Sequence, residues 1–264
     1  MDLPLDGVAR TTLWTVYCRA ACSAAAELHD PEATRICEAL GPSRLKQAFG
    51  RPAPSFAVRA RHFDRRVQAF LDAHPGAAVV SLGEGLETQR HRVRGYGTWT
   101  SVDLPPVLEL RARFLPPDER HRHRAGNVTE RLWLDDLGRG PAVVVAQGLF
   151  MYLRETEVRA LVRGLPQRGE LVLLFDVVPP WLSWVSRLRP PMSRGLRVPH
   201  MPWGVRARGL PALVEDWLGP RVSVQTWPIP MPSGPLPGHY RTSAVEVRWE
   251  TMRSRGGELH SRVV

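Results

Sequence analysis

The sequence predicts an α/β fold in which a mostly parallel sheet is covered by helices on both faces. Short, almost wholly apolar segments alternate with segments of helical periodicity, and one apolar segment ends in a glycine-rich turn. Strands buried on both faces read as continuous apolar runs, as in PAVVVAQG (141–148) and ELVLLFDV (170–177). At 264 residues with 43% hydrophobic side chains, the chain is long enough to bury one large core.

The first 76 residues predict a helical cap. Apolar residues recur at three- and four-residue steps from Leu13 to Leu28, which predicts a helix over the first thirty residues. Pro31 and the pair Gly41–Pro42 delimit a second, short helix. A third helix is expected from Ser55, a candidate N-cap, to just before residue 75.

Residues 77–250 predict the α/β core. Strands are expected at 77–82, 97–105, 122–128, 141–148 and 170–177. Helices are expected from the glycine-rich turn to about residue 94, and at 107–115, 154–165 and 210–218. Two final strands, RVSVQTW and SAVEVRW, are expected to pair as a hairpin at one end of the sheet.

Residues 178–209 interrupt this alternation. They hold six prolines and three tryptophans, without clean periodicity, and are interpreted as a lid or substrate-wall insertion. The polar tail, residues 251–264, is expected to fray.

The net charge of +10 comes almost wholly from arginine, since Lys46 is the only lysine. The most basic segment, Arg111–Arg124, is interpreted as a solvated loop and edge strand rather than a nucleic-acid-binding face. Cys18, Cys22 and Cys37 lack further ligands at zinc spacing, so they predict buried thiols and no metal site. No segment is long and apolar enough to span a bilayer, and the opening residues do not resemble a signal peptide, so we expect a cytoplasmic enzyme.

The first strand ends in Gly83-Glu84-Gly85, and the second strand ends in Asp103. Glycines allow a tight turn and close approach of a ligand, and a carboxylate at the second position can accept hydrogen bonds from both ribose hydroxyls. A dinucleotide fingerprint requires a third glycine where this chain has Thr88. Because S-adenosylmethionine carries no phosphate, this turn favours it over NAD.

Several segments in the correct order resemble the leucine carboxyl methyltransferase family, in particular its bacterial branch of polyketide O-methyltransferases of the tetracenomycin type. The resemblance covers about residues 8–165 and includes VARTTLWTVYCRA, VRARHFDRRV, VVSLGEGLETQRHRV, WTSVDLPPVLELR and VVVAQGLFMYL. It implies a Rossmann-like class I methyltransferase fold with an N-terminal helical extension and S-adenosyl-L-methionine as cofactor.

The resemblance also implies a set of cofactor-binding residues. Arg59 would pair with the cofactor's carboxylate, Gly83 and Gly85 would contact its methionine part, and Asp103 its ribose. Asn127 and Val128 align with the family's adenine-binding pair, and Asn127 stands where the family has aspartate.

The chain departs from the family at three further positions. Glu87 replaces aspartate, Gln89 replaces arginine, and Gln147 replaces a glutamate that lies beside the cofactor's amino group. A neutral amide at position 147 is expected to weaken cofactor binding, so a non-catalytic family member that acts as a binding protein is one alternative function.

The expected reaction is methyl transfer to a carboxylate or hydroxyl of a small molecule, acidic or aromatic, such as a polyketide. Candidate substrate residues are Tyr152, His200 and Trp181; His239 is a further candidate base, and no catalytic base is assigned. An RNA- or protein-directed methyltransferase is the other alternative, and no oligomeric state is predicted.

Overall fold

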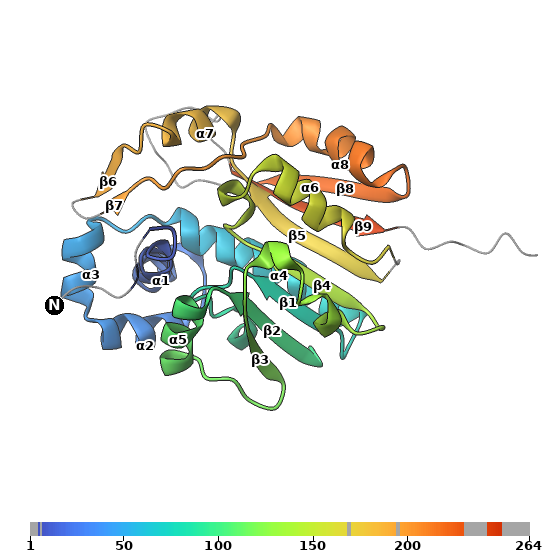
Figure 1. Cartoon of the computed structure of the whole chain (residues 1–264). Helices are drawn as coiled ribbons and strands as arrows, with labels where there is room; N and C mark the ends of the chain where they lie inside the picture. Colours follow the sequence, from blue (N-terminus) through green and yellow to red (C-terminus); the bar gives the residue numbers. More distant parts are fainter. Residues whose placement is uncertain (1–4, 6, 168–169, 194–195, 230–241, 250–264) are drawn as a thin grey trace, which may run out of the picture.

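The computed structural model describes residues 5, 7–167, 170–193, 196–229 and 242–249. Within these ranges the centre of the molecule is a seven-stranded sheet of order β3-β2-β1-β4-β5-β9-β8 (Figure 1). The strands are β1 (Ala78–Leu82), β2 (Thr98–Asp103), β3 (His121–Ala125), β4 (Ala142–Ala146), β5 (Leu171–Val177), β8 (Val222–Pro228) and β9 (Ser243–Trp249). Strands β1 to β5 are parallel, and β9 runs antiparallel to both β5 and β8.

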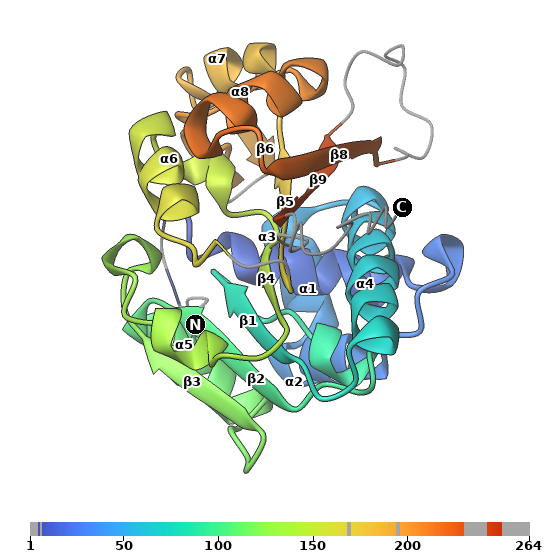
Figure 2. The ribbon, with the colours of Figure 1, turned by 90° about the vertical axis from the view of Figure 1, so that its right-hand side faces the viewer.

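The sheet is covered on both faces, which is why its central strands are apolar throughout. Successive side chains of β4 point to opposite faces: Val143 and Val145 join one core cluster, and Val144 joins another. Helix α4 (Ser55–Ala73) packs on the first face, while α6 (Glu155–Arg163) and α8 (Leu210–Leu218) pack on the second (Figure 2). The predicted α/β architecture is confirmed.

Three N-terminal helices lie beyond the carboxyl ends of the parallel strands (Figure 1). They are α1 (Thr11–Cys22), α2 (Pro31–Leu40) and α3 (Pro42–Phe49), and α5 (Pro105–Phe114) packs beside them. These helices bury a separate apolar cluster, which includes Leu13, Ile36 and Leu45. The N-terminal segment therefore covers the edge of the sheet at which a ligand is expected.

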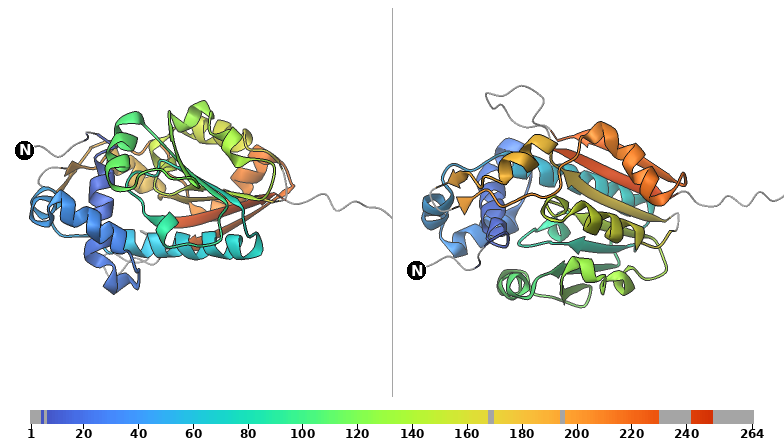
Figure 3. Two further views of the ribbon diagram at one scale, coloured as in Figure 1. Left: turned by 90° about the horizontal axis from the view of Figure 1, so that it is seen from below. Right: turned by 45° about the horizontal axis from the view of Figure 1, so that its top comes forward.

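The insertion after β5 runs across the molecule to the N-terminal helices. It contains α7 (Pro180–Ser186), β6 (Pro191–Ser193) and β7 (Leu196–Arg197), and β6 reaches α3 (Figure 3). Short 3₁₀ turns complete the description: η1 (Ala24–Ala26), η2 (Gln89–His91), η3 (Val128–Glu130), η4 (Leu134–Leu137), η5 (Phe150–Tyr152) and η6 (Ala207–Gly209).

The helix expected after the first strand is wrong, because only η2 forms there. Side chains of this segment that a helix would expose instead make buried contacts. The backbone N–H of Thr88 bonds to the Glu87 side chain, and Arg92 reaches back to the carboxylate of Glu87. These side-chain hydrogen bonds and ion pairs take the place of the backbone hydrogen bonds that a helix would form here.

Other boundaries also differ from expectation. Helix α1 ends at Cys22, and the left-handed Glu27 (φ +52°) turns the chain before α2. The sequence prediction missed α3, whose start is marked by Pro42 in the first turn. Ser55 is the first residue of α4 rather than its N-cap.

The edge hairpin of β8 and β9 is confirmed, whereas the lid is more regular than predicted because it contains α7 and the β6–β7 pair. The division into a cap (1–76) and a core (77–250) stays a prediction, and α4 within that cap covers the sheet. The expected tail at 251–264 lies outside the described residues.

Candidate functional site

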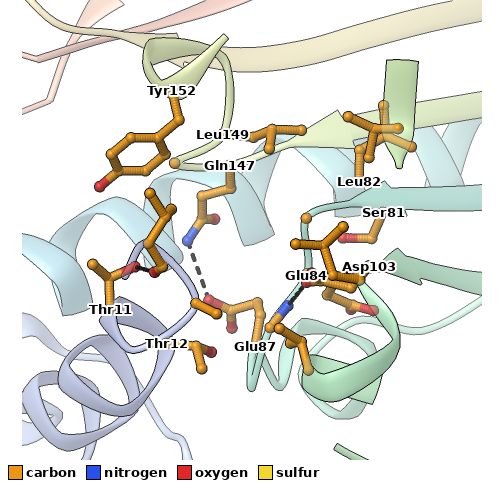
Figure 4. A pocket seen from close by; sticks show the side chains of 18 of the residues that line it. Thr11, Thr12, Ser81, Leu82, Glu84, Glu87, Asp103, Gln147, Leu149 and Tyr152 are labelled. Atoms are coloured by element: carbon orange, nitrogen blue, oxygen red, sulfur yellow. Dashed lines mark hydrogen bonds between the residues drawn. The ribbon is translucent and has the colours of Figure 1, made fainter. Parts of the chain in front are cut away.

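A pocket opens at the carboxyl ends of β1, β2 and β4. The chain proceeds from β1 to β3 on one side and resumes at β4 on the other, and such a reversal leaves a crevice between neighbouring strands. The cavity has a volume of about 310 Å³, and residues of α1 complete its lining (Figure 4). All of the residues predicted to bind a cofactor line it, namely Arg59, Gly83, Gly85, Asp103, Asn127, Val128 and Gln147.

The turn after β1 contains two positions that favour glycine. Gly83 has a φ of +60° and Gly85 a φ of +56°, in the left-handed region. A Cβ atom on Gly85 would lie 2.2 Å from the hydroxyl oxygen of Thr12 in α1. That hydroxyl accepts a hydrogen bond from the backbone N–H of Leu86 at 2.6 Å. Helix α1 is therefore docked directly on the glycine turn.

Arg111 supports the turn from the interior of the protein. Its guanidinium donates to the backbone carbonyls of Gly85 and Glu87 at 2.8 Å each, and it forms a fully buried ion pair with Glu84 at 3.1 Å. The Trp99 indole also donates to Glu84 at 3.0 Å. These contacts fix the backbone that lines the pocket.

The buried position of Arg111 corrects the interpretation of the whole segment Arg111–Arg124 as solvated. At the other end of the segment, Arg124 is ion-paired with Asp136. The expected edge strand is confirmed, since β3 lies at one end of the sheet.

Asp103 holds the glycine turn as well as facing the pocket. Its Oδ2 accepts from the backbone N–H of Gly85 at 2.7 Å (Figure 4), and its Oδ1 accepts from that of Leu104 at 2.8 Å. Burial raises the pKa of Asp103, and these two N–H donors oppose that rise. A carboxylate has about four acceptor positions, so Asp103 retains the capacity to bind ligand hydroxyls.

Arg59 extends from α4 to the pocket and meets a carboxylate that sequence reasoning missed. Its Nη1 donates to Asp176 Oδ2 at 3.1 Å, and the backbone N–H of Gly148 donates to Asp176 Oδ1 at 2.5 Å. Asp176 is completely buried near the end of β5. A charged residue within the apolar run LVLLFDV was the available signal, because a buried carboxylate requires partners.

Gln147, at the end of β4, contacts Glu87. Its Nε2 donates to Glu87 Oε2 at 3.1 Å (Figure 4). Glu87 also pairs with Arg19 at 3.1 Å and Arg92 at 2.8 Å. Burial alone would raise the pKa of Glu87, but the two arginines outweigh it and lower the pKa to about 2. Glu87 is therefore an ionised carboxylate that lines the pocket.

The side chain of Asn127 already makes one local hydrogen bond. Its side-chain oxygen accepts from the backbone N–H of Thr129 at 3.1 Å and so caps η3. The neighbouring Val128 is buried, and its carbonyl accepts from the Trp133 indole at 2.9 Å. The side-chain N–H groups of Asn127 are the part best placed to serve a ligand.

Only one of the three substrate candidates lines the pocket. Tyr152 does so, near Thr11 (Figure 4), and burial raises the pKa of its hydroxyl to about 12, so it is a neutral group. Trp181 and His200 are exposed residues of the lid, and neither belongs to the cavity lining that the described residues form. Their roles stay predictions. His239 lies outside the described residues.

The three cysteines are free and buried, as predicted, and burial raises the pKa of each thiol. A search of the described residues finds no cluster of three histidine, cysteine, aspartate or glutamate side chains suited to a metal ion. In the same residues, no helix has the length and hydropathy needed to cross a membrane.

Comparison with known proteins finds a family and a relative. The family model for leucine carboxyl methyltransferase matches residues 21–165. The tetracenomycin polyketide synthesis O-methyltransferase TcmP of Streptomyces glaucescens is 40% identical over 130 residues, which cover 47% of each chain. The match thus spans about half the length of that relative.

Several solved structures have a fold similar to that of this chain, although their sequence identity to it is low. The methyltransferase domain of bacterial CtHen1-C is 14% identical with a TM-score of 0.51, over 74% of this chain and all of that one. The small RNA methyltransferase HEN1 is 12% identical with a TM-score of 0.51, over 72% of this chain and 25% of that one. These likenesses show the Rossmann-like class I methyltransferase fold.

Proposed function

The chain belongs to the leucine carboxyl methyltransferase family, and we propose that it is an S-adenosylmethionine-dependent O-methyltransferase. The observation that carries this proposal is the assembly of the predicted cofactor residues around one pocket at the carboxyl ends of the strands. When bound, S-adenosylmethionine supplies a methyl group on a positively charged sulfur, and the protein's main task is to hold an oxygen nucleophile in line with it.

The pocket residues fit this cofactor. Asp103 can accept hydrogen bonds from ribose hydroxyls, and Asn127 can donate to an adenine nitrogen. Arg59 makes a single hydrogen bond to Asp176, which leaves further guanidinium donors for the cofactor's carboxylate. The turn with Thr88 in place of a third glycine favours this nucleoside over a dinucleotide.

We propose a carboxylate as the methyl acceptor, because the lining formed by the described residues offers no base that is free to take a proton. Its described lining contains no histidine, lysine or cysteine. Glu84 and Glu87 are ion-paired with arginines, Asp103 accepts two backbone N–H groups and is assigned to the ribose, and Tyr152 is neutral. A phenol with a pKa of about 10 would have to lose a proton, whereas a carboxylate is already ionised at neutral pH.

The relative TcmP is a tetracenomycin polyketide synthesis O-methyltransferase. By analogy, we propose an acidic, polyketide-like small molecule as the acceptor and a cytoplasmic location. The buried Arg111 and the paired Arg124 disfavour the alternative of an RNA-directed enzyme that would use this segment.

Two measurements test the proposal. Calorimetric titration is expected to show binding of S-adenosylhomocysteine and no binding of NAD. Binding of NAD alone would refute the proposal.

The second measurement identifies the acceptor. Incubation with methyl-labelled S-adenosylmethionine and aromatic carboxylic acids is expected to give a product that releases label in mild base, as a methyl ester does. A base-stable methyl ether would instead identify a hydroxyl acceptor. Cofactor binding without transfer to any acceptor would favour a non-catalytic binding protein.

A further inference from the structure

Helix α7 of the lid buries two serines and exposes large apolar side chains. Its buried residues are Ser183 and Ser186, whereas Leu182 is only half-buried. Ser183 Oγ donates to the carbonyl of Met201 at 2.7 Å, and Ser186 Oγ accepts from the backbone N–H of Met201 at 2.8 Å. A helix that only covered a core would place its largest apolar side chains on the inner face. The outer face of α7 therefore has a different role.

Three apolar side chains are exposed along one side of this helix and the turn after it. Trp181, Trp184 and Leu188 recur at steps of three and four residues and are 39%, 62% and 70% exposed. We call these three residues the apolar face of α7. The helix lies at the periphery of the molecule in both Figure 1 and Figure 2. Because the inner serines bond it to the chain at Met201, the apolar face is a fixed feature of the surface.

The lid is also strongly basic. Residues 178–209 include six arginines and neither aspartate nor glutamate. Arg187 and Arg189 stand on either side of Leu188 in the chain, and both are exposed. Arg197 is exposed as well, and its guanidinium donates to the backbone carbonyl of Arg189 at 3.3 Å, which places a third cation beside them. The apolar face of α7 is thus bordered by positive charge that the lid itself does not neutralise.

This combination of side chains matches an anionic lipid surface. Tryptophan and leucine next to arginine are typical of segments that lie in the interface of a bilayer, where the apolar side chains reach the acyl boundary. Negatively charged headgroups attract each arginine that comes close to them.

A protein partner matches this surface less well. A two-fold contact with a second copy of the chain would bring two basic lids together, and like charges across an interface repel. A stable complex with another protein buries about 800 Å² on each side, whereas one large aromatic side chain contributes about 150–250 Å². The apolar face of α7 is therefore small for a protein interface but large enough to insert between lipid headgroups.

We propose that the lid binds the surface of anionic lipid membranes through the apolar face of α7 and the arginines beside it. The contact is peripheral, and it lies close to the pocket. Leu182 of α7 and the pocket residue Tyr152 pack against the same apolar cluster, which includes Met201. An apolar acceptor that partitions into the lipid would thus be concentrated near the pocket. The inference goes beyond the proposed function and does not depend on it, because it involves no cofactor residue.

The test is co-sedimentation of the whole chain with two kinds of vesicle, one of phosphatidylcholine and one of phosphatidylcholine and phosphatidylglycerol in equal parts. The chain is expected to bind the anionic vesicles at least about tenfold more tightly, and added salt should weaken that binding. Trp184→Ala and Leu188→Ala should each weaken it by about threefold or more, because less apolar area enters the interface. Arg187→Gln should weaken it by about threefold, because one attracted charge is lost.

Leu132→Ala and Arg139→Gln are the matched controls. Leu132 is 62% exposed and Arg139 is exposed, and both lie between β3 and β4, outside the lid. These variants should bind vesicles as the wild-type chain does, and urea unfolding checks the fold of every variant.

Equal losses in the lid variants and their controls would overturn the inference, because the net charge of +10 would then attract lipid without a specific site. A wild-type chain that ignores anionic vesicles would overturn it too. Binding to soluble polyglutamate in place of vesicles would instead indicate an acidic protein partner. Binding of S-adenosylhomocysteine is measured separately, so the proposed function stands or fails on its own.

Discussion

Asp103 supports the turn and also lines the pocket, since both of its oxygens accept backbone N–H groups. Asp103→Ala is therefore expected to weaken binding of S-adenosylhomocysteine by about 2 kcal/mol or more, through lost ribose contacts and a loosened turn. Asp103→Asn, which keeps one acceptor for Gly85, should lose less. Calorimetry measures the loss, and unchanged affinity in a folded Ala variant would show that the ribose lies elsewhere.

A glutamate at position 147 is expected to tighten cofactor binding if charge alone is considered. The structure changes this expectation, because Glu87 lies 3.1 Å from the Gln147 amide, and the charge of Glu87 is already shared with its ion-pair partners Arg19 and Arg92. In Gln147→Glu, repulsion between two carboxylates should raise the pKa of one of them. The protonated, neutral form predominates below that pKa and binds an ammonium group less well.

The affinity of Gln147→Glu for S-adenosylhomocysteine should consequently rise with pH between about pH 5 and 8. The wild-type affinity should stay flat in that range, because the pKa of Glu87 is about 2. Dissociation constants measured across this range check both profiles. Equally flat curves for the two proteins would contradict the charge coupling between positions 87 and 147.

At the scale of elements, the contact between α1 and the glycine turn is specific. Gly85→Ala would place a Cβ atom 2.2 Å from Thr12 Oγ1 in a left-handed conformation, with an expected cost of about 1–3 kcal/mol. Thr12→Ala removes the nearest obstacle, the hydroxyl oxygen, but also the acceptor for the Leu86 N–H. The double variant should therefore be more stable than the sum of the single losses predicts, by about 0.5 kcal/mol or more in urea unfolding.

Gly83→Ala serves as the control for this cycle. Its Cβ would approach the flexible end of Leu149 at 2.8 Å, and its three nearest neighbours are all atoms of Leu149 rather than of Thr12. Its loss of stability should add to that of Thr12→Ala without coupling. Coupling of equal size in both cycles would mean that Thr12 acts on the turn only indirectly.

The sequence predicts features that depend on neighbouring residues and misses those that depend on residues far apart in the chain. Gly83, Gly85 and Asp103 were predictable because a buried strand followed by a glycine turn is a local pattern. The bond from Leu86 to Thr12 joins residues 74 positions apart, so no local pattern contains it. The helix expected after Gly85 failed for the same reason: Arg92 is held by carboxylates from three separate segments, a tertiary effect that overrides propensity.

At the scale of the whole molecule, the insertion after β5 is anchored in the core rather than resting on the surface. Trp203 is buried among Phe150, Phe175 and Trp217, with ring centroids 6.2–6.4 Å away. Its backbone N–H donates to the carbonyl of Met151, beside the pocket residue Tyr152. The lid and the pocket lining thus share one packed cluster. The sequence could not distinguish this tryptophan from the two exposed ones on α7, since all three lie in a segment without periodicity.

Two tryptophans of the lid provide a matched pair for testing this anchoring. Trp203→Ala is expected to cost about 3–5 kcal/mol, because it leaves a large cavity in the core. That loss is a substantial part of the roughly 5–15 kcal/mol that stabilises an ordinary domain. Trp184 is 62% exposed, so Trp184→Ala should change stability by no more than about 0.5 kcal/mol. Urea unfolding of both variants measures the difference. Similar losses would contradict the anchoring, because a lid held only at the surface would make its tryptophans equivalent.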